Sequence, residues 1–151
     1  MAPADTAQHE EERPFHGAKL LLTEGGRLLT CLRDDVDHIP FPAYWDLPGG
    51  GRENRESPER CALRELHEEF SLRLNPGRLQ GHAFPSHQQP KMISWLFVGP
   101  LSPAEIAAIR FGDEGQEWRM MPLAQFLDHP RAVPHFKQWI KALPNQLDSA
   151  F

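Results

Sequence analysis

Three glutamates in one short segment, Glu65, Glu68 and Glu69, have the residue type and the spacing to bind a metal ion. They lie in 57–70 (SPERCALRELHEEF), where Ser57 is a good N-cap and the proline after it suits the first helical position. At about 100° per residue, the three carboxylates fall on one side of such a helix. The apolar residues fall on the opposite face: Ala62, Leu63, Leu66 and Phe70. Like charges at these spacings repel, and a divalent cation with oxygen ligands, such as Mg²⁺, would reverse that repulsion.

An acidic face opposite an apolar face is also typical of a helix that simply faces solvent, so the helix alone leaves both readings open. The preceding Gly49, Gly50 and Gly51 favour a binding site. We expect these glycines to form a tight turn between a strand and the helix, where a phosphate can approach the backbone closely. A plain turn is the alternative.

The charged residues around the helix allow structural as well as binding roles. We expect Glu53 or Glu56 to form an ion pair with Arg64 that braces the loop against the helix. The candidates for phosphate contact, each with ordinary solvated surface as the alternative, are Arg52, Arg55 and Arg60.

Taken together, Gly50 to Leu72 resembles the Nudix box, G-x5-E-x7-R-E-U-x-E-E-x-G-U, in which U is a bulky aliphatic residue. The residues in register are Gly50, Glu56, Arg64, Glu65, Leu66, Glu68, Glu69 and Leu72. The preceding segment 45–49 (WDLPG) is similar to the family's usual lead-in. Ser71 departs from the pattern, which has glycine there, but this departure concerns the end of the helix and leaves every carboxylate in place. The family's elements would occupy roughly residues 15–143.

The resemblance implies the Nudix fold, an α/β fold in which a mixed β-sheet is sandwiched between helices. It also implies Mg²⁺ or Mn²⁺ as cofactor and hydrolysis of a nucleoside diphosphate linked to another group. Carried over by position, Glu68 and Glu69 are the main metal ligands, and Glu65 is a further ligand or the general base. Metal ions at such a site neutralise the charge of the diphosphate and acidify a bound water.

The resemblance assigns roles beside the helix as well. The Gly49 carbonyl joins the metal sphere, and Glu56 and Arg64 form a structural ion pair. In several family members the general base lies on a loop outside the box. The candidates here are Asp113, Glu114 and Glu117 in FGDEGQEW. We place Glu114 first, because the flanking glycines would let that loop move; an ordinary acidic surface loop is the alternative.

The box leaves the substrate open. The short chain and compact box fit the MutT-like branch, so a (d)NTP pyrophosphohydrolase is our first expectation. ADP-ribose or a nucleotide sugar is the alternative substrate, although Pro85 lies slightly earlier than the proline of ADP-ribose members. The one tyrosine, Tyr44, precedes the box, which argues against dinucleoside polyphosphates. The candidates to stack on a base, with core packing as the alternative, are Trp95, Phe97 and Trp118.

Two other classes of protein share this fold. A non-catalytic Nudix-fold nucleotide sensor usually lacks some box glutamates, whereas this sequence retains them all. Diphosphate isomerisation would need a catalytic cysteine, and Cys61, inside the box helix, does not have a suitable context.

Composition sets the wider limits. The 151 residues suit one domain, 15–151, preceded by a flexible N-terminal tail, 1–14. A net charge of −5 argues against a broad basic face for a nucleic-acid polymer, so the expected partner is a small nucleotide or nucleotide derivative. The sequence has neither a run of about 18 apolar residues nor a secretory signal, so we expect no membrane association and a cytoplasmic location. The residues indicate no particular oligomeric state.

The elements that must position these residues follow from apolar runs and turn residues. The expected strands are 18–24 and 27–33, joined as a hairpin by Gly25-Gly26, and then 44–47, 78–87, 91–98 and 117–121. The expected helices, besides 57–70, are 103–110, 123–127 and 135–143, and the expected loops are 34–43 and 111–116.

Overall fold

The computed structural model describes residues 14–144, so the predicted tail, apart from Pro14, lies outside the described residues. The strands are β1 Phe15–Glu24, β2 Arg27–Leu32, β3 Trp45–Asp46, β4 Gly49–Gly51, β5 Gln80–Pro85, β6 Ile93–Pro100 and β7 Glu117–Pro122. The helices are α2 Pro58–Phe70, α3 Pro103–Ala107, α4 Leu123–Asp128 and α5 Pro134–Lys141, with a 3₁₀ turn at Pro76–Arg78. Within this described range, no helix has the length and apolar character needed to cross a membrane.

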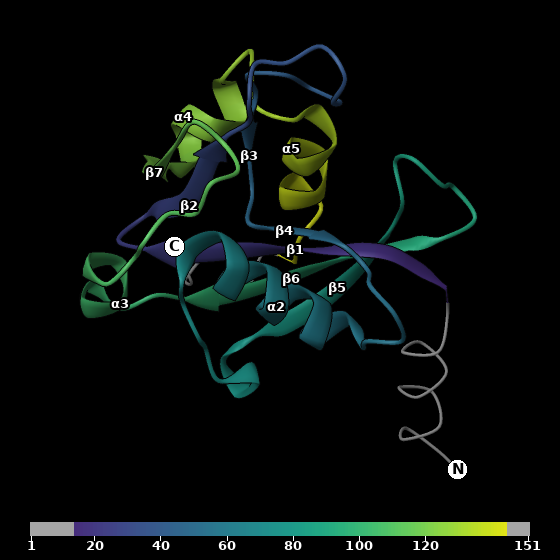
Figure 1. The fold of residues 1–151 in the computed structure, drawn as a ribbon, viewed down its shortest axis with the longest axis horizontal. Coiled ribbons are helices and arrows are strands. Elements are labelled where there is room, and N and C mark those ends of the chain that lie inside the picture. The colour runs from purple at the N-terminus through teal and green to yellow at the C-terminus, as the bar shows by residue number, and fades with distance from the viewer. Residues whose placement is uncertain (1–13, 145–151) are drawn as a thin grey trace.

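The sheet is mixed, and β1 is its organising strand. It pairs antiparallel with β2 and β4 and parallel with β6, while β5 borders β6 and both β3 and β7 pair with β2. Figure 1 shows α2 on one face of this sheet and α4 and α5 on the other. The expected α/β fold, with a mixed sheet between helices, is confirmed.

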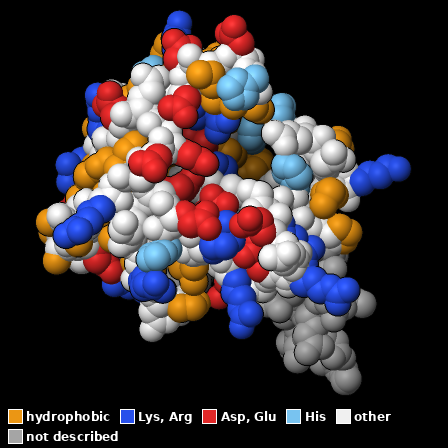
Figure 2. Space-filling view, in the orientation of Figure 1, with side chains coloured by type: hydrophobic (Ala, Val, Ile, Leu, Met, Phe, Trp, Pro, Cys, Tyr) orange, Lys and Arg blue, Asp and Glu red, His pale blue; other side chains and the backbone are white. Residues whose placement is uncertain are grey.

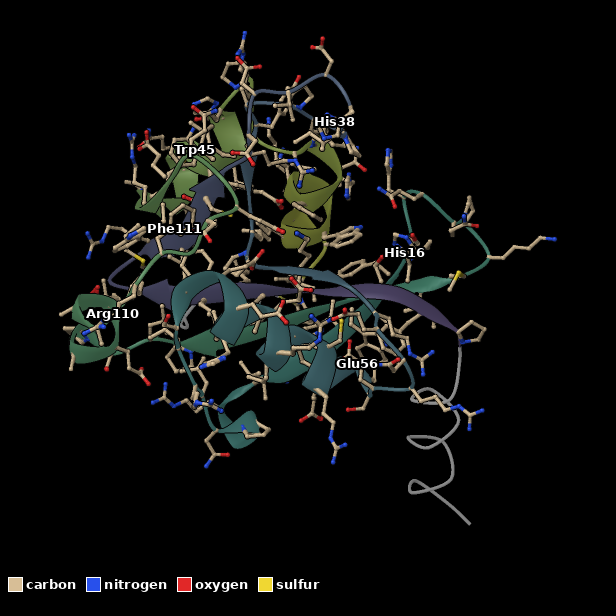
Figure 3. All side chains as sticks on the ribbon, in the orientation of Figure 1. His16, His38, Trp45, Glu56, Arg110 and Phe111 are labelled. Carbon is tan, nitrogen blue, oxygen red and sulfur yellow. The ribbon has the colours of Figure 1, made fainter. Side chains whose placement is uncertain are left out.

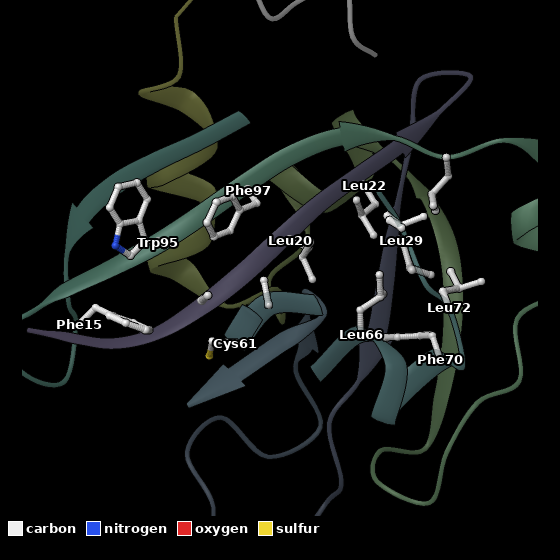
Figure 4. Packing of buried hydrophobic residues seen from close by; sticks show 14 residues of the cluster. Phe15, Leu20, Leu22, Leu29, Cys61, Leu66, Phe70, Leu72, Trp95 and Phe97 are labelled. Carbon is white, nitrogen blue, oxygen red and sulfur yellow. The ribbon is translucent and has the colours of Figure 1, made fainter. Parts of the chain in front are cut away.

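Alternation along β1 builds the two halves of the core. Leu20 and Leu22 belong to the apolar cluster under α2, seen in Figure 4, whereas Leu21 belongs to the cluster under α4 and α5. Each of these fully buried leucines contributes about 1.5–3 kcal/mol to folding. Lys19, which does not face α2, borders a cavity described below. The strand therefore separates the packed helix α2 from an open site on the other face.

The glycine segment differs from the predicted turn. Gly49–Gly51 forms the short strand β4, which pairs with β1 in the register Lys19↔Gly49, Ala18↔Gly50 and Gly17↔Gly51. Gly49 has a φ of 125°, and a Cβ there would lie 2.2 Å from the Ala18 carbonyl oxygen. The glycines are therefore needed for a close approach of two backbones, which a turn prediction does not capture.

Candidate active site

Helix α2 has the boundaries that its sequence predicts. The Ser57 hydroxyl accepts a hydrogen bond from the Arg60 amide at 3.2 Å. At the other end Ser71 adopts the left-handed conformation (φ 58°, ψ 32°), and its amide donates to the His67 carbonyl. The buried residues are Pro58, Cys61, Ala62, Leu66 and Phe70. Leu63, predicted on the apolar face, is only half-buried at its edge, and Cys61 lies there instead.

Glu69 is the glutamate of α2 that approaches β4 through a hydrogen bond. Its Oε1 accepts from the Gly49 amide at 2.9 Å. Burial raises the pKa of Glu69 to about 7, against the opposing effects of Lys19 and the Gly49 amide. A buried carboxylate with so little compensation is suited to holding a cation or a proton.

Glu65 lies one turn earlier, against Gly50. A Cβ built on Gly50 would lie 2.7 Å from the Cδ of Glu65, so only glycine leaves room for this carboxylate. Burial raises the pKa of Glu65, the neighbouring Arg64 opposes the rise, and Glu68 adds to it. Two carboxylates of α2 thus converge on two consecutive glycines of β4.

Arg64 forms the predicted ion pair with Glu56 and also contacts three other glutamates. Its Nε and Nη2 donate to the two Glu56 oxygens at 3.0 and 2.8 Å, a bidentate arrangement that lowers the pKa of Glu56. Its Nη1 lies 2.8 Å from Glu65 Oε1 and 3.2 Å from Glu68 Oε2. The sequence leaves open whether Glu53 or Glu56 is the partner, and in the structure both contact Arg64. Figure 2 shows the resulting acidic patch, and Figure 3 shows Glu56 at the start of α2.

The carboxylates of this site suit the implied metal ion chemically, but among the described residues their side chains do not surround a common metal position. Among residues 14–144, no group of three or more His, Cys, Asp or Glu side chains is positioned to hold a metal ion. Arg64 draws Glu65 and Glu68 toward itself, whereas Glu69 faces the Gly49 amide. All the donors are carboxylate oxygens, which are the ligands that Mg²⁺ and Mn²⁺ prefer. The Gly49 carbonyl, implied as a ligand, accepts from Lys19 Nζ at 3.1 Å.

A cavity of about 310 Å³ opens beside β4. One wall is the backbone of β1 and β4, including Gly50 and Gly51. The opposite wall is aromatic and consists of Phe41, His87, His135, Phe136 and Trp139. Figure 3 labels His16, another lining residue, between α5 and the loop that joins β5 to β6. Sequence reasoning missed this wall, because its rings come from three distant segments.

Two positively charged side chains that line this cavity are paired with the same carboxylate. Lys19 Nζ lies 3.1 Å from Asp46 Oδ1, and Arg33 Nη1 lies 2.8 Å from Asp46 Oδ2. Burial opposes the charge on Lys19, but Asp46 and Glu69 outweigh it, so the pKa of Lys19 is raised. Sequence reasoning also missed this trio, although a lysine inside the apolar strand AKLLL marks a charged group that needs a partner.

Two predicted substrate contacts lie away from the cavity. Trp95 pairs across the sheet with Ala18 and therefore points toward α2, where it is buried and stacked on Phe97 at 5.9 Å. Arg52 donates to the Glu56 carbonyl and covers the Phe15 ring at 4.3 Å. Trp95 therefore follows the core-packing alternative, whereas Arg52 is exposed and braces the loop before α2, and its contact with phosphate stays a prediction.

Glu114 is exposed in a loop that is bonded at both ends. The Gly112 amide donates to the Glu69 carbonyl at 2.9 Å, and the Gly115 amide donates to Asp34 Oδ2 at 3.3 Å. Gly115 has a φ of 90°, a conformation that glycine adopts easily, so it serves a fixed turn. The loop is thus held against the C-terminal end of α2, where Figure 3 labels Phe111.

Comparison with known proteins gives relatives of several activities. Residues in this chain are 40% identical over 63 positions to diphosphoinositol polyphosphate phosphohydrolase 3-alpha of Homo sapiens, covering 42% of this chain but only 38% of that protein. They are 29% identical over 119 positions to an RNA pyrophosphohydrolase of Azorhizobium caulinodans, covering 69% and 64% of the two chains. The crystal structure of the MutT protein from Methanosarcina mazei Go1 superposes with a TM-score of 0.67 at 24% identity, covering 86% and 93%.

The family itself is clear from a wider match. The model of the NUDIX domain matches residues 16–143, which include every strand after the first residue of β1 and every described helix. The box predicted at Gly50 to Leu72 lies inside this range and forms β4, the following loop and α2. The chain therefore belongs to the NUDIX domain family.

Proposed function

We propose that this protein hydrolyses the diphosphate linkage of a small nucleotide, with nucleoside triphosphates as the first expectation and ADP-ribose or a nucleotide sugar as the alternative. The observation that supports this choice is the aromatic-walled cavity beside β4. A phosphate chain lying along Gly50 and Gly51 would reach Glu65, while a planar base would lie among the rings of the other wall.

The charge of the cavity separates a nucleotide from a polyphosphorylated inositol. A ring that carries many phosphates needs several free cations around it. Lys19 and Arg33, which line the cavity, are both paired with Asp46. The aromatic rings that line the cavity instead suit a base, which is flat and uncharged. The resemblance to the human diphosphoinositol polyphosphate phosphohydrolase covers only 63 positions and 38% of that protein, so it supports shared chemistry rather than a shared substrate.

The residues of α2 supply the groups that the reaction needs. Glu68 and Glu69, with Glu65, would hold Mg²⁺ or Mn²⁺, which when bound neutralises the phosphate oxygens and acidifies water. Water adds to one phosphorus atom, the bridging P–O bond breaks, and the leaving group departs as an anion. The water proton passes to a carboxylate oxygen of Glu65 or of Glu114. Arg64 orients Glu65 through the 2.8 Å contact at Oε1.

A substrate panel tests this proposal. Nucleoside triphosphates, ADP-ribose, a nucleotide sugar and a diphosphoinositol polyphosphate are incubated with the protein and Mg²⁺ or Mn²⁺, and phosphate and pyrophosphate are both assayed. We expect nucleoside monophosphate and pyrophosphate from a triphosphate. Preference for the inositol compound would contradict the interpretation of the cavity. If none of the compounds were cleaved, the proposed enzymatic function would be contradicted.

A further inference from the structure

Two histidines stack at the aromatic wall of the cavity. The His87 and His135 rings lie 4.4 Å apart between centroids, with 4° between their planes. His87 is exposed on the loop between β5 and β6, whereas His135 is half-buried at the start of α5. Edges of Phe136 and Trp139 pack on the His135 ring, at 4.4 and 5.3 Å. The plane of His135 is therefore fixed, and one of its faces is covered by another planar ring.

The His87 ring has little else to hold it. Within the described part of the chain its side chain makes no hydrogen bond, and its only other ring contact is with Phe41 at 6.2 Å. Other groups hold the loop together. The Ser86 backbone amide donates to the Met92 carbonyl at 3.0 Å, and the Gln89 backbone amide donates to the Ser86 hydroxyl at 3.2 Å. The ring can leave the stack without breaking these bonds.

One ring nitrogen of His135 lacks a hydrogen-bond partner among the described residues. Its Nδ1 is buried and has no hydrogen-bond partner among residues 14–144. Burial lowers the pKa of His135 to about 4, and His87 adds to this effect, so the ring is neutral at pH 7. A neutral imidazole offers one donor and one acceptor, and a buried polar atom without a partner is unfavourable. A neutral planar ring of this kind suits stacking against another planar ring.

We propose that the His87 ring occupies the position in which the base of the substrate stacks on His135, and that the base displaces it. A base is planar like the imidazole, so it fits the stacked position that His87 fills. His87 is then an internal competitor, and His135 is a stacking residue for the base. This inference rests on the proposed nucleotide substrate.

Binding of nucleoside monophosphates tests the proposal apart from hydrolysis, because these compounds have no diphosphate to cleave. AMP, GMP, CMP and UMP are titrated by calorimetry, with ribose 5-phosphate as a probe without a base. We expect His87→Ala to tighten binding of at least one nucleotide about threefold to tenfold, the worth of an aromatic pair. We expect His135→Ala to weaken the same nucleotide about threefold to tenfold, because the ring on which the base stacks is lost, and His135→Phe, which keeps a planar ring, to retain most of the binding.

Two controls separate this role from a general effect on the loop. Gln89→Ala lies on the same loop outside the cavity lining and should bind like the wild type, and ribose 5-phosphate should bind equally to every variant. Weaker binding to His87→Ala would make His87 part of the binding wall and overturn the displacement. Equal binding to wild type and His135→Ala, or no nucleotide binding to any variant, would overturn the inference even where the protein hydrolyses triphosphates. Binding without hydrolysis would instead refute only the proposed function.

Discussion

The carboxyl group of Glu65 lies against the α-carbon of Gly50, with room for a hydrogen atom and nothing larger. A Cβ at position 50 would meet Glu65 Cδ and Oε2, each at 2.7 Å. Because β1 fixes the backbone of β4 and the core fixes α2, neither element can retreat easily. Gly50 is therefore needed for the Glu65 carboxyl group to lie beside β4.

Gly50→Ala tests this contact. We expect turnover to fall about tenfold or more, because the methyl group displaces the Glu65 carboxyl, and the free energy of unfolding to change by less than about 1 kcal/mol, because the displaced atoms are the end of a flexible side chain. Gly51→Ala is the matched control, since the nearest atom to its added Cβ is the His16 carbonyl oxygen at 3.9 Å. Rate assays and urea unfolding of both variants decide the matter, and equal behaviour of the two would refute the argument.

Glu68→Gln and Glu69→Gln should each lower turnover by at least about two orders of magnitude while the fold stays intact. Each change removes a charged oxygen from the proposed metal site, where charge stabilises the transition state. Loss of repulsion on α2 should leave the protein without metal as stable or more stable. Steady-state rates at saturating Mg²⁺ and thermal unfolding without metal are the measurements. Near-normal turnover in both variants would exclude the metal platform.

Glu114→Gln should cost more activity than Glu117→Gln, and the loss should be mainly in kcat. Glu114 is exposed beside the end of α2, whereas Glu117 is paired with Arg119 at 3.1 Å on β7. A residue used only in the transition state affects kcat more than KM. Should Glu65→Gln abolish the pH-dependent step while Glu114→Gln has no effect, the general base would belong to α2.

The pair Arg78–Glu105 should make stability depend on acid. Both Arg78 Nη atoms donate to Glu105 at 2.8 Å, and this lowers the pKa of Glu105 to about 2. Since the folded pKa is depressed, the stabilisation is present above the unfolded value near 4.5 and disappears as the pH falls toward 2. We expect Glu105→Gln to cost about 1 kcal/mol at pH 7, after allowance for solvent screening, and nothing at pH 2.

Urea unfolding between pH 2 and pH 7 measures this difference. Glu117→Gln, in the more exposed pair with Arg119, is the control and should cost less at pH 7. A constant difference between wild type and Glu105→Gln across the range would assign the effect to the helix cap at Ser102 rather than to the charge.

Ser71→Gly should change stability by less than about 1 kcal/mol, because two effects oppose each other. Glycine relieves the left-handed strain of a residue at φ 58°, a cost of roughly 1 kcal/mol, but adds freedom to the unfolded chain. Activity should stay within a few-fold, since the glutamates are placed by earlier turns. Calorimetry and a rate assay test both statements, and a large rise in kcat would mean that serine impairs the site.

Much of α2 could be predicted, because its information is local. The cap at Ser57, the apolar spacing and the order of charges all lie within one helix, and the match to the box added the ion pair of Glu56 and Arg64. The strand β4 could not be predicted, because three glycines look alike in a turn and in a backbone-to-backbone contact. Only the pairing with β1 distinguishes the two.

The cavity depended on tertiary contacts. Phe41 lies in a Pro-rich loop at φ 50°, His87 in a short loop and His135 at a helix start, and no sequence spacing connects them. The sequence makes Trp95 a candidate to stack on a base because a strand offers two faces. Its face is set by the register with Ala18, which sequence alone does not give.

The bonds of the segment from Gly112 to Gly115 have a mechanical consequence. One end is tied to the carbonyl of Glu69 on α2, and the other to Asp34, whose loop also carries Phe41 at the cavity wall. One short segment therefore connects the last turn of α2, which carries Glu69, with the loop that carries Phe41 at the cavity wall.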